Sequence, residues 1–207
     1  MKKRTTVVNL FAGPGAGKST FCAGIFASLK WLGVNCEMAL EYAKDLVWQN
    51  SYDVLGNQLY VFGKQQNRLY RLYQKVDIVV TDSPLLNSIV YDAQKRPRTK
   101  AAFIELVLAE HSAYDNLNFF IERRKRYNPV GRTQTEAEAS DLDAKIVEVL
   151  YTYGIPYTPI VGVPEEIATV IKAIFAYRSD IIIETDKNDI LKAPLAAVLG
   201  SGFPATR

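Results

Sequence analysis

The sequence is poor in the residues that build disulfide frameworks and imidazole sites. Its 207 residues include 2 cysteines and 1 histidine, which excludes a disulfide-rich secreted fold and any site made of several histidines. Long apolar runs are also missing, since no stretch approaches the roughly 18 residues that a membrane-spanning helix needs. The formal net charge of +3 is too small for a protein that coats nucleic acid or an anionic membrane. These absences predict a globular cytoplasmic protein with no membrane partner.

The chain instead alternates short β-branched runs with longer segments of helical period. This alternation predicts an α/β fold in which helices cover a parallel sheet. We expect one domain over residues 1–178 and a C-terminal extension over 179–207, to which we assign no role. Strands are expected over 6–11, 35–40, 77–81, 118–121 and 157–161, with a candidate edge strand over 181–183. Helices are expected over 18–32, 41–49, 54–74, 100–110, 135–153 and 164–177, with a candidate short helix over 190–199.

A glycine-rich loop, AGPGAGKS over residues 12–19, joins the first expected strand to the first helix. It matches the Walker A pattern, with Ala12 in place of the first glycine. Glycines let consecutive N–H groups and the helix N-terminus face phosphates, Lys18 can bridge the β- and γ-phosphates, and the Ser19 hydroxyl can bind Mg²⁺. The alternative is a turn that binds nothing, but the lysine, the hydroxyl and the strand–loop–helix context favour ATP with Mg²⁺. The expected nucleotide-binding residues are Gly13, Pro14, Gly15, Ala16, Gly17, Lys18, Ser19 and Thr20.

Two carboxylates follow strands of the expected sheet. Asp82 comes directly after the strand at 77–81, and Glu41 follows the strand at 35–40. Because ligands gather at the carboxyl ends of parallel strands, Asp82 is a candidate Mg²⁺ ligand or proton acceptor, and Glu41 a candidate base for an acceptor hydroxyl. Asp82 could instead cap the next helix, and Glu41 could merely favour a helix N-terminus. The sequence does not decide which of the two would act as the base.

The fourth expected strand runs into a basic loop that carries five Lys or Arg residues over 122–132. Arginines on a loop opposite the phosphates can close over a nucleotide and neutralise the transferring group. We therefore expect a lid over 122–134 with Arg126 and Arg132 as catalytic residues, because Arg123 could still belong to the strand end. The alternative is a solvated loop. That interpretation remains the favoured one for a second basic loop, 95–100, which could otherwise contact a phosphate-bearing substrate or a DNA backbone.

The Walker A loop, the Glu41-Tyr42 pair and the strand ending in Asp82 resemble the P-loop kinases of the nucleoside and nucleotide kinase superfamily, in particular their ribosylnicotinamide-kinase-like domain. The resemblance implies a three-layer fold with a five-stranded parallel sheet in the order 2-3-1-4-5, which would place Glu41 and Asp82 beside the phosphate loop. It also implies that residues 162–164 lie near adenine. The stretches 9–19, 81–85 and 127–132 further resemble bacteriophage P-loop kinases, some of which phosphorylate 5-hydroxymethyluracil in DNA.

The function predicted from these features is ATP- and Mg²⁺-dependent phosphoryl transfer to a hydroxyl. The acceptor would be a nucleoside, a nucleotide or a modified base such as 5-hydroxymethyluracil in phage DNA, in which case DNA is a partner and the host cytoplasm the location. The alternative is an ATPase or nucleotide switch with no phosphorylated acceptor. The expected catalytic residues are Lys18, Asp82, Glu41, Arg126 and Arg132, and the expected Mg²⁺ ligands are Ser19 and Asp82. The oligomeric state stays open.

Overall fold

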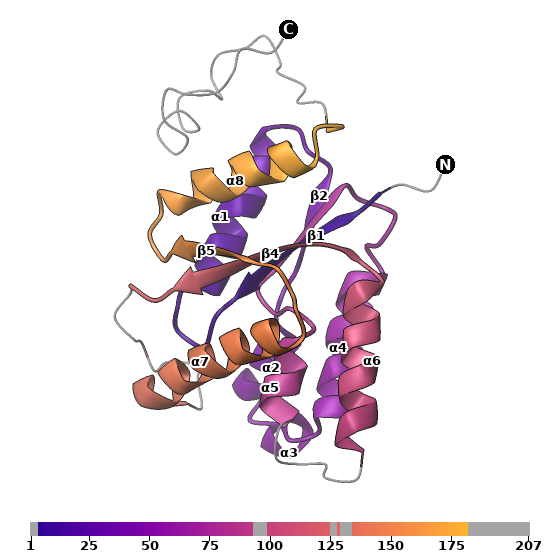
Figure 1. Ribbon diagram of the computed structural model, residues 1–207, viewed down its shortest axis with the longest axis vertical. Coiled ribbons are helices and arrows are strands. Elements are labelled where there is room, and N and C mark those ends of the chain that lie inside the picture. The colour runs from indigo at the N-terminus through magenta and orange to yellow at the C-terminus, as the bar shows by residue number, and fades with distance from the viewer. Residues whose placement is uncertain (1–3, 93–98, 125–127, 129–133, 182–207) are drawn as a thin grey trace, which may run out of the picture.

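The computed structural model describes residues 4–92, 99–124, 128 and 134–181. Five parallel strands form one sheet in the order β2-β3-β1-β4-β5 (Figure 1). The strand order, the parallel pairing and the α/β class are therefore confirmed. The strands are β1 (Thr6–Phe11), β2 (Cys36–Ala39), β3 (Ile78–Thr81), β4 (Asp115–Glu122) and β5 (Thr158–Val161).

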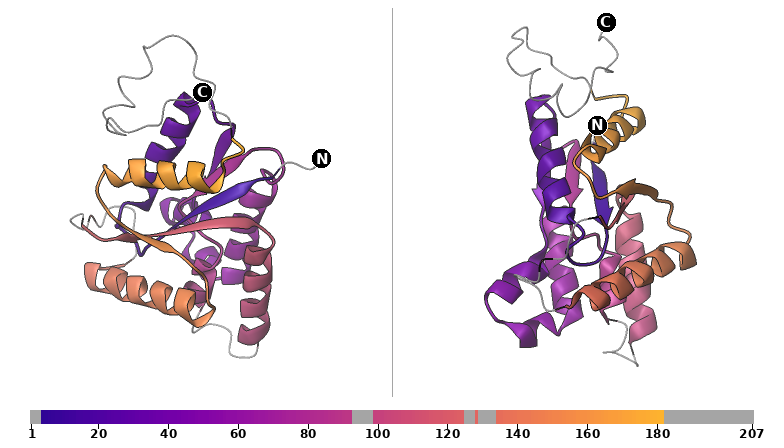
Figure 2. Two further views of the ribbon diagram at one scale, coloured as in Figure 1. Left: turned by 45° about the horizontal axis from the view of Figure 1, so that its top comes forward. Right: turned by 90° about the vertical axis from the view of Figure 1, so that its left-hand side faces the viewer.

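Helices cover both faces of the sheet, which is why the central strands are apolar on both sides. All residues of β1 and β3 are buried. One face packs on α1 (Lys18–Trp31) and α8 (Glu166–Tyr177), and the other on α4 (Gln58–Tyr70), α5 (Asn87–Asp92), α6 (Lys100–Ser112) and α7 (Glu136–Thr152) (Figures 1 and 2). Two short helices, α2 (Tyr42–Trp48) and α3 (Tyr52–Leu55), pack against α4. No helix among the described residues is long and apolar enough to cross a membrane.

Three of the expected elements differ from the structure. The helix expected over 54–74 is two helices, because the side chain of Asn57 accepts a hydrogen bond from the Tyr60 N–H and so starts a new helix after Gly56. Helix α5 was not among the helices whose bounds were expected, and β4 begins at Asp115 rather than at residue 118. Ile181, the last described residue, belongs to no strand. Residues 182–183 of the expected edge strand and the helix expected over 190–199 lie outside the described residues.

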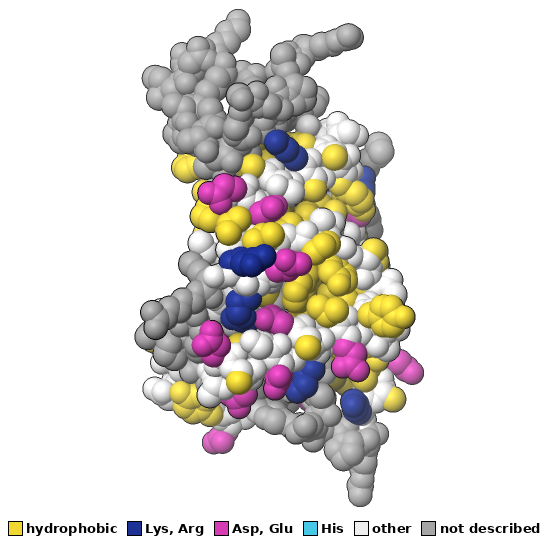
Figure 3. All heavy atoms as spheres, turned by 60° about the vertical axis from the view of Figure 1, so that its left-hand side comes forward, with side chains coloured by type: hydrophobic (Ala, Val, Ile, Leu, Met, Phe, Trp, Pro, Cys, Tyr) yellow, Lys and Arg dark blue, Asp and Glu magenta, His cyan; other side chains and the backbone are white. Residues whose placement is uncertain are grey.

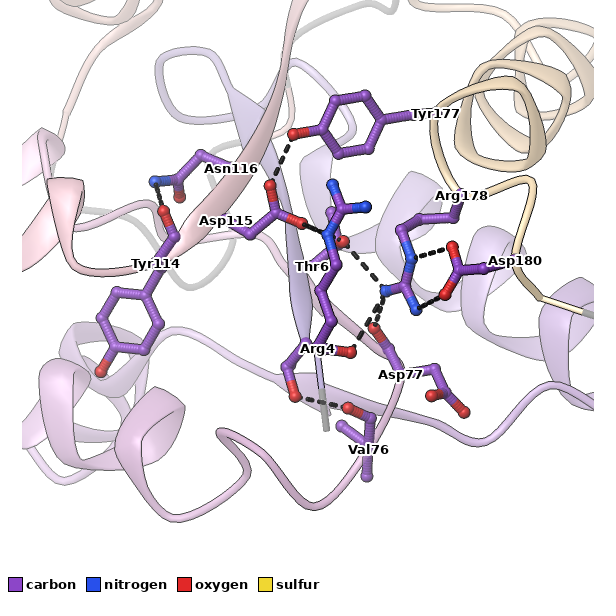
Figure 4. Close-up of polar contacts among 11 residues, drawn as sticks. Arg4, Thr6, Val76, Asp77, Tyr114, Asp115, Asn116, Tyr177, Arg178 and Asp180 are labelled. Atoms are coloured by element: carbon purple, nitrogen blue, oxygen red, sulfur yellow. Dashed lines mark hydrogen bonds and ion pairs between the residues drawn. The ribbon is translucent and has the colours of Figure 1, made fainter. Parts of the chain in front are cut away.

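A buried arginine ties the last helix to the amino ends of the strands (Figure 4). Arg178 is 2% exposed and donates hydrogen bonds to the carbonyl of Arg4, the Thr6 hydroxyl and the carbonyl of Asp77, while it forms a two-pronged pair with Asp180. This pairing lowers the pKa of Asp180 to about 2. The cluster fixes the end of the sheet opposite the phosphate loop, and its role is structural.

Hydrophobic side chains also gather on part of the face that Figure 3 shows. Here α7 and the segment leading into β5 form an open apolar groove whose lining includes Val147, Tyr151, Ile155 and Tyr157. Tyr151 is 86% exposed. This groove lies outside the candidate site described next, and it shares none of the residues that line that site.

Candidate active site

The phosphate loop, residues 12–19, connects β1 to α1 and depends on two glycines for its path. Gly15 and Gly17 have φ angles of 82° and 103°, a left-handed conformation that other residues rarely adopt. Lys18 Nζ donates to the carbonyl oxygens of Ala12 and Gly13 at 2.8 and 3.0 Å. Burial lowers the pKa of Lys18, although nearby carboxylates oppose that shift. The loop thus holds its ammonium group beside the backbone amides that open α1.

Asp82 joins the phosphate loop to the ends of β2 and β3. Its Oδ2 accepts a hydrogen bond from the Ser19 hydroxyl at 2.6 Å, and its Oδ1 accepts one from the Glu41 N–H at 2.9 Å. The carboxylate is 2% exposed. Because β2, β3 and β1 are neighbours in the sheet, their carboxyl ends bring these three residues together as the sequence predicted. Helix α5 begins only at Asn87, so Asp82 does not cap it.

The pair formed by Ser19 and Asp82 fits a magnesium ion. A hydroxyl and a carboxylate are hard oxygen donors, and Mg²⁺ in phosphoryl-transfer sites is usually held by one or two such groups together with phosphate oxygens. Among the described residues, no cluster of three or more His, Cys, Asp or Glu side chains could hold a metal. An ion at this position would therefore depend on the phosphates of a bound nucleotide, as the Walker A pattern implies.

A cavity of about 450 Å³ extends from the phosphate loop toward α2, α3, α4 and α5. This volume is typical of pockets for small ligands. Glu41 lines it at the start of α2 and is half-buried. Burial raises the pKa of the nearby Tyr91 phenol, and the Glu41 carboxylate raises it further. The other residues that line the cavity include Lys18, Ser19, Lys44, Trp48, Tyr52, Gln58, Gln65, Asp82, Asn87 and Ser88.

An ion pair that the sequence did not reveal holds the other side of the phosphate loop. Arg123 follows β4 directly, and its Nη2 lies 2.9 Å from Oδ2 of Asp143 on α7. Arg123 Nη1 also donates to the carbonyl of Pro14 at 2.8 Å, and the Gly13 N–H donates to Asp143 Oδ1. The two side chains are 15% and 19% exposed. No motif marks Asp143, and the sequence left open whether Arg123 belongs to the strand end. Only the packing of α7 on the loop brings the two residues together.

Gly13 is required by this packing rather than by its backbone angles. A Cβ atom at Gly13 would overlap the carbonyl oxygen of Ala139 and lie 2.9 Å from Asp143 Oδ1. Gly162, which follows β5, lies close to the phosphate loop. Its N–H donates to the Glu122 carbonyl, and a Cβ atom at this position would lie 3.5 Å from the Ala16 carbonyl oxygen. The segment that the resemblance placed near adenine therefore begins beside the phosphate loop.

The expected site residues Arg126, Arg132 and Thr20 are not among the residues that line the cavity of the described structure. Arg126, Arg132 and residues 95–98 of the second basic loop fall outside the described residues. Thr20 is exposed in the first turn of α1 and does not line the cavity. Both cysteines are free and buried, and neither of them lines the cavity.

Comparisons with known proteins agree with this fold. A family model described as "AAA domain" matches residues 7–166. The structure resembles NadR protein in complex with NAD and AMP-PNP (TM-score 0.63, 16% identity) and NadR in complex with NR (TM-score 0.60, 15% identity). Each likeness covers 89% of this chain, which spans about half of the NadR chains, 52% and 54%.

A third solved structure is deoxyadenosine kinase from M. mycoides with dCMP and dCDP bound (TM-score 0.51, 20% identity), where 84% of this chain covers 100% of that one. Comparison with curated protein sequences gave no match. At these identities the likenesses establish a P-loop kinase-like fold.

Proposed function

The chain belongs to the AAA domain family whose model matches residues 7–166, and from this premise we propose that it is an ATP-dependent kinase that phosphorylates a hydroxyl group. One observation carries the proposal. The phosphate loop, the Ser19–Asp82 pair and Glu41 meet at one end of a cavity that continues well beyond the loop. An ATPase needs room only for water beyond the phosphates, whereas a kinase needs a second pocket for its acceptor.

The hydrogen bonds support different roles for the two carboxylates. Both oxygens of Asp82 already accept hydrogen bonds, one from the Ser19 hydroxyl, and the group is almost fully buried. Asp82 is thus suited to orienting Mg²⁺ through Ser19. Glu41 is half-buried at the start of the acceptor pocket and is suited to taking the proton from the acceptor hydroxyl.

The proposed reaction is a single displacement at the γ-phosphorus of ATP. The acceptor oxygen forms the new bond to phosphorus, the bond between the γ-phosphorus and the bridging oxygen breaks, and ADP leaves with that oxygen. Glu41 takes the proton, while Lys18 and the amides from Gly15 to Ser19 hold the triphosphate. When bound, Mg²⁺ supplies positive charge that offsets the charge of the phosphates. Arg126 and Arg132 are the proposed lid residues.

Several acceptors remain within this proposal: a nucleoside, a nucleotide or a modified base such as 5-hydroxymethyluracil in DNA. The solved neighbours favour the first two, because besides AMP-PNP the molecules bound to them are NR, NAD, dCMP and dCDP. A pocket enclosed by four helices also suits a small molecule or one extruded base better than a paired strand.

The test is incubation with γ-labelled ATP, Mg²⁺ and a panel of nucleosides, nucleotides and DNA that contains 5-hydroxymethyluracil. We expect label on one class of acceptor and none with Lys18→Ala. Glu41→Gln should lower kcat by about 10²–10⁴-fold with ATP affinity unchanged, as loss of a general base does. Asp82→Asn should instead raise the Mg²⁺ concentration needed for half-maximal rate.

Glu105→Gln, on the exposed side of α6, is the matched control and should behave as the parent protein. Release of ADP with only free phosphate, across the whole panel, would refute the kinase proposal and favour an ATPase or switch. Equal effects of Glu41→Gln and Glu105→Gln would refute the role given to Glu41.

A further inference from the structure

The side-chain amide of Asn87 differs from the two amides that α4 contributes to the cavity in its hydrogen bonding. Asn87 is the first residue of α5, lines the cavity and is 7% exposed. Its Oδ1 is fully buried, and no hydrogen-bond partner lies within reach of it among the described residues. The two amides that α4 contributes are bonded: Gln58 donates to the Leu55 carbonyl, and Gln65 accepts from the Tyr42 N–H.

An unpartnered buried amide is unfavourable in the ligand-free protein, because its desolvation is not offset by any contact. Such groups are rare in folded proteins, and each calls for a physical reason. Within the part of the chain that the structure describes, no side-chain hydrogen bond fixes the orientation of Asn87, so its carboxamide can turn to present either the oxygen or the nitrogen to the cavity. A bound molecule with complementary groups would remove the penalty.

The rest of the cavity indicates what kind of molecule that would be. Trp48 and Tyr52 line it and are 62% and 51% exposed, so their ring faces are open to stacking. Trp48 lies seven residues after Glu41, about 10 Å along α2 at 1.5 Å per residue. Lys44 is the one charged side chain that α2, α3, α4 and α5 contribute to the lining. The pocket beyond Glu41 is therefore largely uncharged, partly aromatic and long enough for a sugar joined to a flat ring.

We propose that Asn87 selects the acceptor by pairing with the edge of a nitrogen heterocycle that carries an N–H donor beside an acceptor atom. The ring stacks against the aromatic residues of the same cavity, and its sugar hydroxyl lies toward Glu41. A carboxamide offers one donor and one acceptor side by side, which is how asparagine pairs with bases in nucleic-acid complexes. This inference rests on the proposed function, since it names the group recognised at the acceptor pocket.

Binding can be measured without catalysis. The chain has 2 tryptophans, and Trp31, on α1, does not line the cavity. In a Trp31→Phe background, the fluorescence of Trp48 reports on the pocket alone. We would titrate this protein, without ATP, with uridine, cytidine, adenosine and guanosine, and then with the analogue of the tightest binder that is N-methylated on its pairing edge. A short DNA with 5-hydroxymethyluracil distinguishes a base in DNA from a free nucleoside.

We expect at least one nucleoside, or the DNA, to quench Trp48. Asn87→Ala should raise the Kd of that nucleoside or DNA about tenfold or more and abolish the preference for the unmethylated ring. Asn67→Ala, on an exposed position of α4, should change neither. Because the Asn87 side chain makes no hydrogen bond to any described residue that the substitution would break, the urea midpoint of Asn87→Ala should not fall. A purely structural asparagine would show the opposite pattern, a lower midpoint with unchanged discrimination between rings.

Equal Kd values for the parent and Asn87→Ala would overturn the inference. So would failure of every nucleoside and of the DNA to quench Trp48 while a fluorescent ATP analogue still binds at the phosphate loop, and that result would leave a kinase with another acceptor. If the parent protein does not bind ATP, the proposed function itself is overturned, so the two failures are distinguishable.

Discussion

The ion pair between Arg123 and Asp143 offers a direct test of how the phosphate loop is held. Arg123 donates to the carbonyl of Pro14, and Asp143 accepts from the N–H of Gly13, so both partners grip the loop by its backbone. The substitution Asp143→Asn keeps the size of the side chain and removes its charge. Arg123 then faces a neutral amide in a site where little water reaches it.

The cost follows from the burial of the pair. Removing one partner of a fully buried ion pair costs about 3–5 kcal/mol, whereas an exposed pair contributes about 0–1 kcal/mol. With side-chain exposures of 15% and 19%, the pair lies nearer the buried limit. We therefore expect Asp143→Asn to lower the free energy of unfolding by about 2–3 kcal/mol. Urea denaturation should show a lower midpoint at an unchanged m value.

The same substitution should weaken ATP binding, because the Gly13 N–H then donates to a neutral amide oxygen and Arg123 loses the charged partner beside the phosphate loop. A fluorescent ATP analogue measures this effect directly. Asp141→Asn, an exposed position on the same helix, is the control and should stay within about 0.5 kcal/mol of the parent. The double-mutant cycle with Arg123→Met should give a coupling energy of about 1–3 kcal/mol. A coupling energy near zero, or equal effects of the two Asp→Asn changes, would refute the reasoning.

Three further outcomes follow from single residues. His111 is the one histidine of the chain and is 5% exposed. Burial lowers its pKa to about 4, against about 6.5 when unfolded, so the free energy of unfolding should fall by about 3 kcal/mol between pH 6.5 and 4. Urea titrations of the parent and of His111→Phe at several pH values check this, since the step should vanish in the variant. Gly13→Ala should weaken binding of a fluorescent ATP analogue, because its Cβ would overlap the Ala139 carbonyl; unchanged affinity would contradict that packing. Arg178→Met should lower the melting temperature by several degrees, because the Arg4 carbonyl, the Thr6 hydroxyl and the Asp77 carbonyl each lose a hydrogen bond from the guanidinium; a melting temperature equal to that of the parent would show that the cluster contributes nothing.

The sheet was predictable because its strands carry their own signal. Mostly apolar runs, rich in β-branched residues, at 6–11 and 77–81 match β1 and β3 closely, since strands buried on both faces are largely apolar. The strand order came from resemblance, not from periodicity. The missed helix α5 has six residues, which is fewer than two helical turns and too short for a helical period to be read from the sequence. The break at Gly56 was missed because the residues on both sides continue a helical pattern.

The parts of the candidate site that could be predicted are the phosphate loop and the two carboxylates beside it. The phosphate loop is one contiguous segment, and its glycines, lysine and serine are informative without knowledge of any other part of the chain. Asp82 and Glu41 could be placed beside it because parallel strands align their carboxyl ends at one edge. Each of these inferences needs only local sequence and one general rule of topology.

By itself, the sequence determined the α/β class, the phosphate loop and the strand ends that carry acidic residues. Only the tertiary structure decided that Asp82 accepts hydrogen bonds from both Ser19 and Glu41, that Arg123 pairs with Asp143 across the loop, and that Oδ1 of Asn87 is buried without a partner among the described residues. The physical reason is that a hydrogen bond or an unmet hydrogen-bonding group depends on which side chains packing brings within about 3 Å. Residues far apart in the chain carry no local pattern that records such a distance.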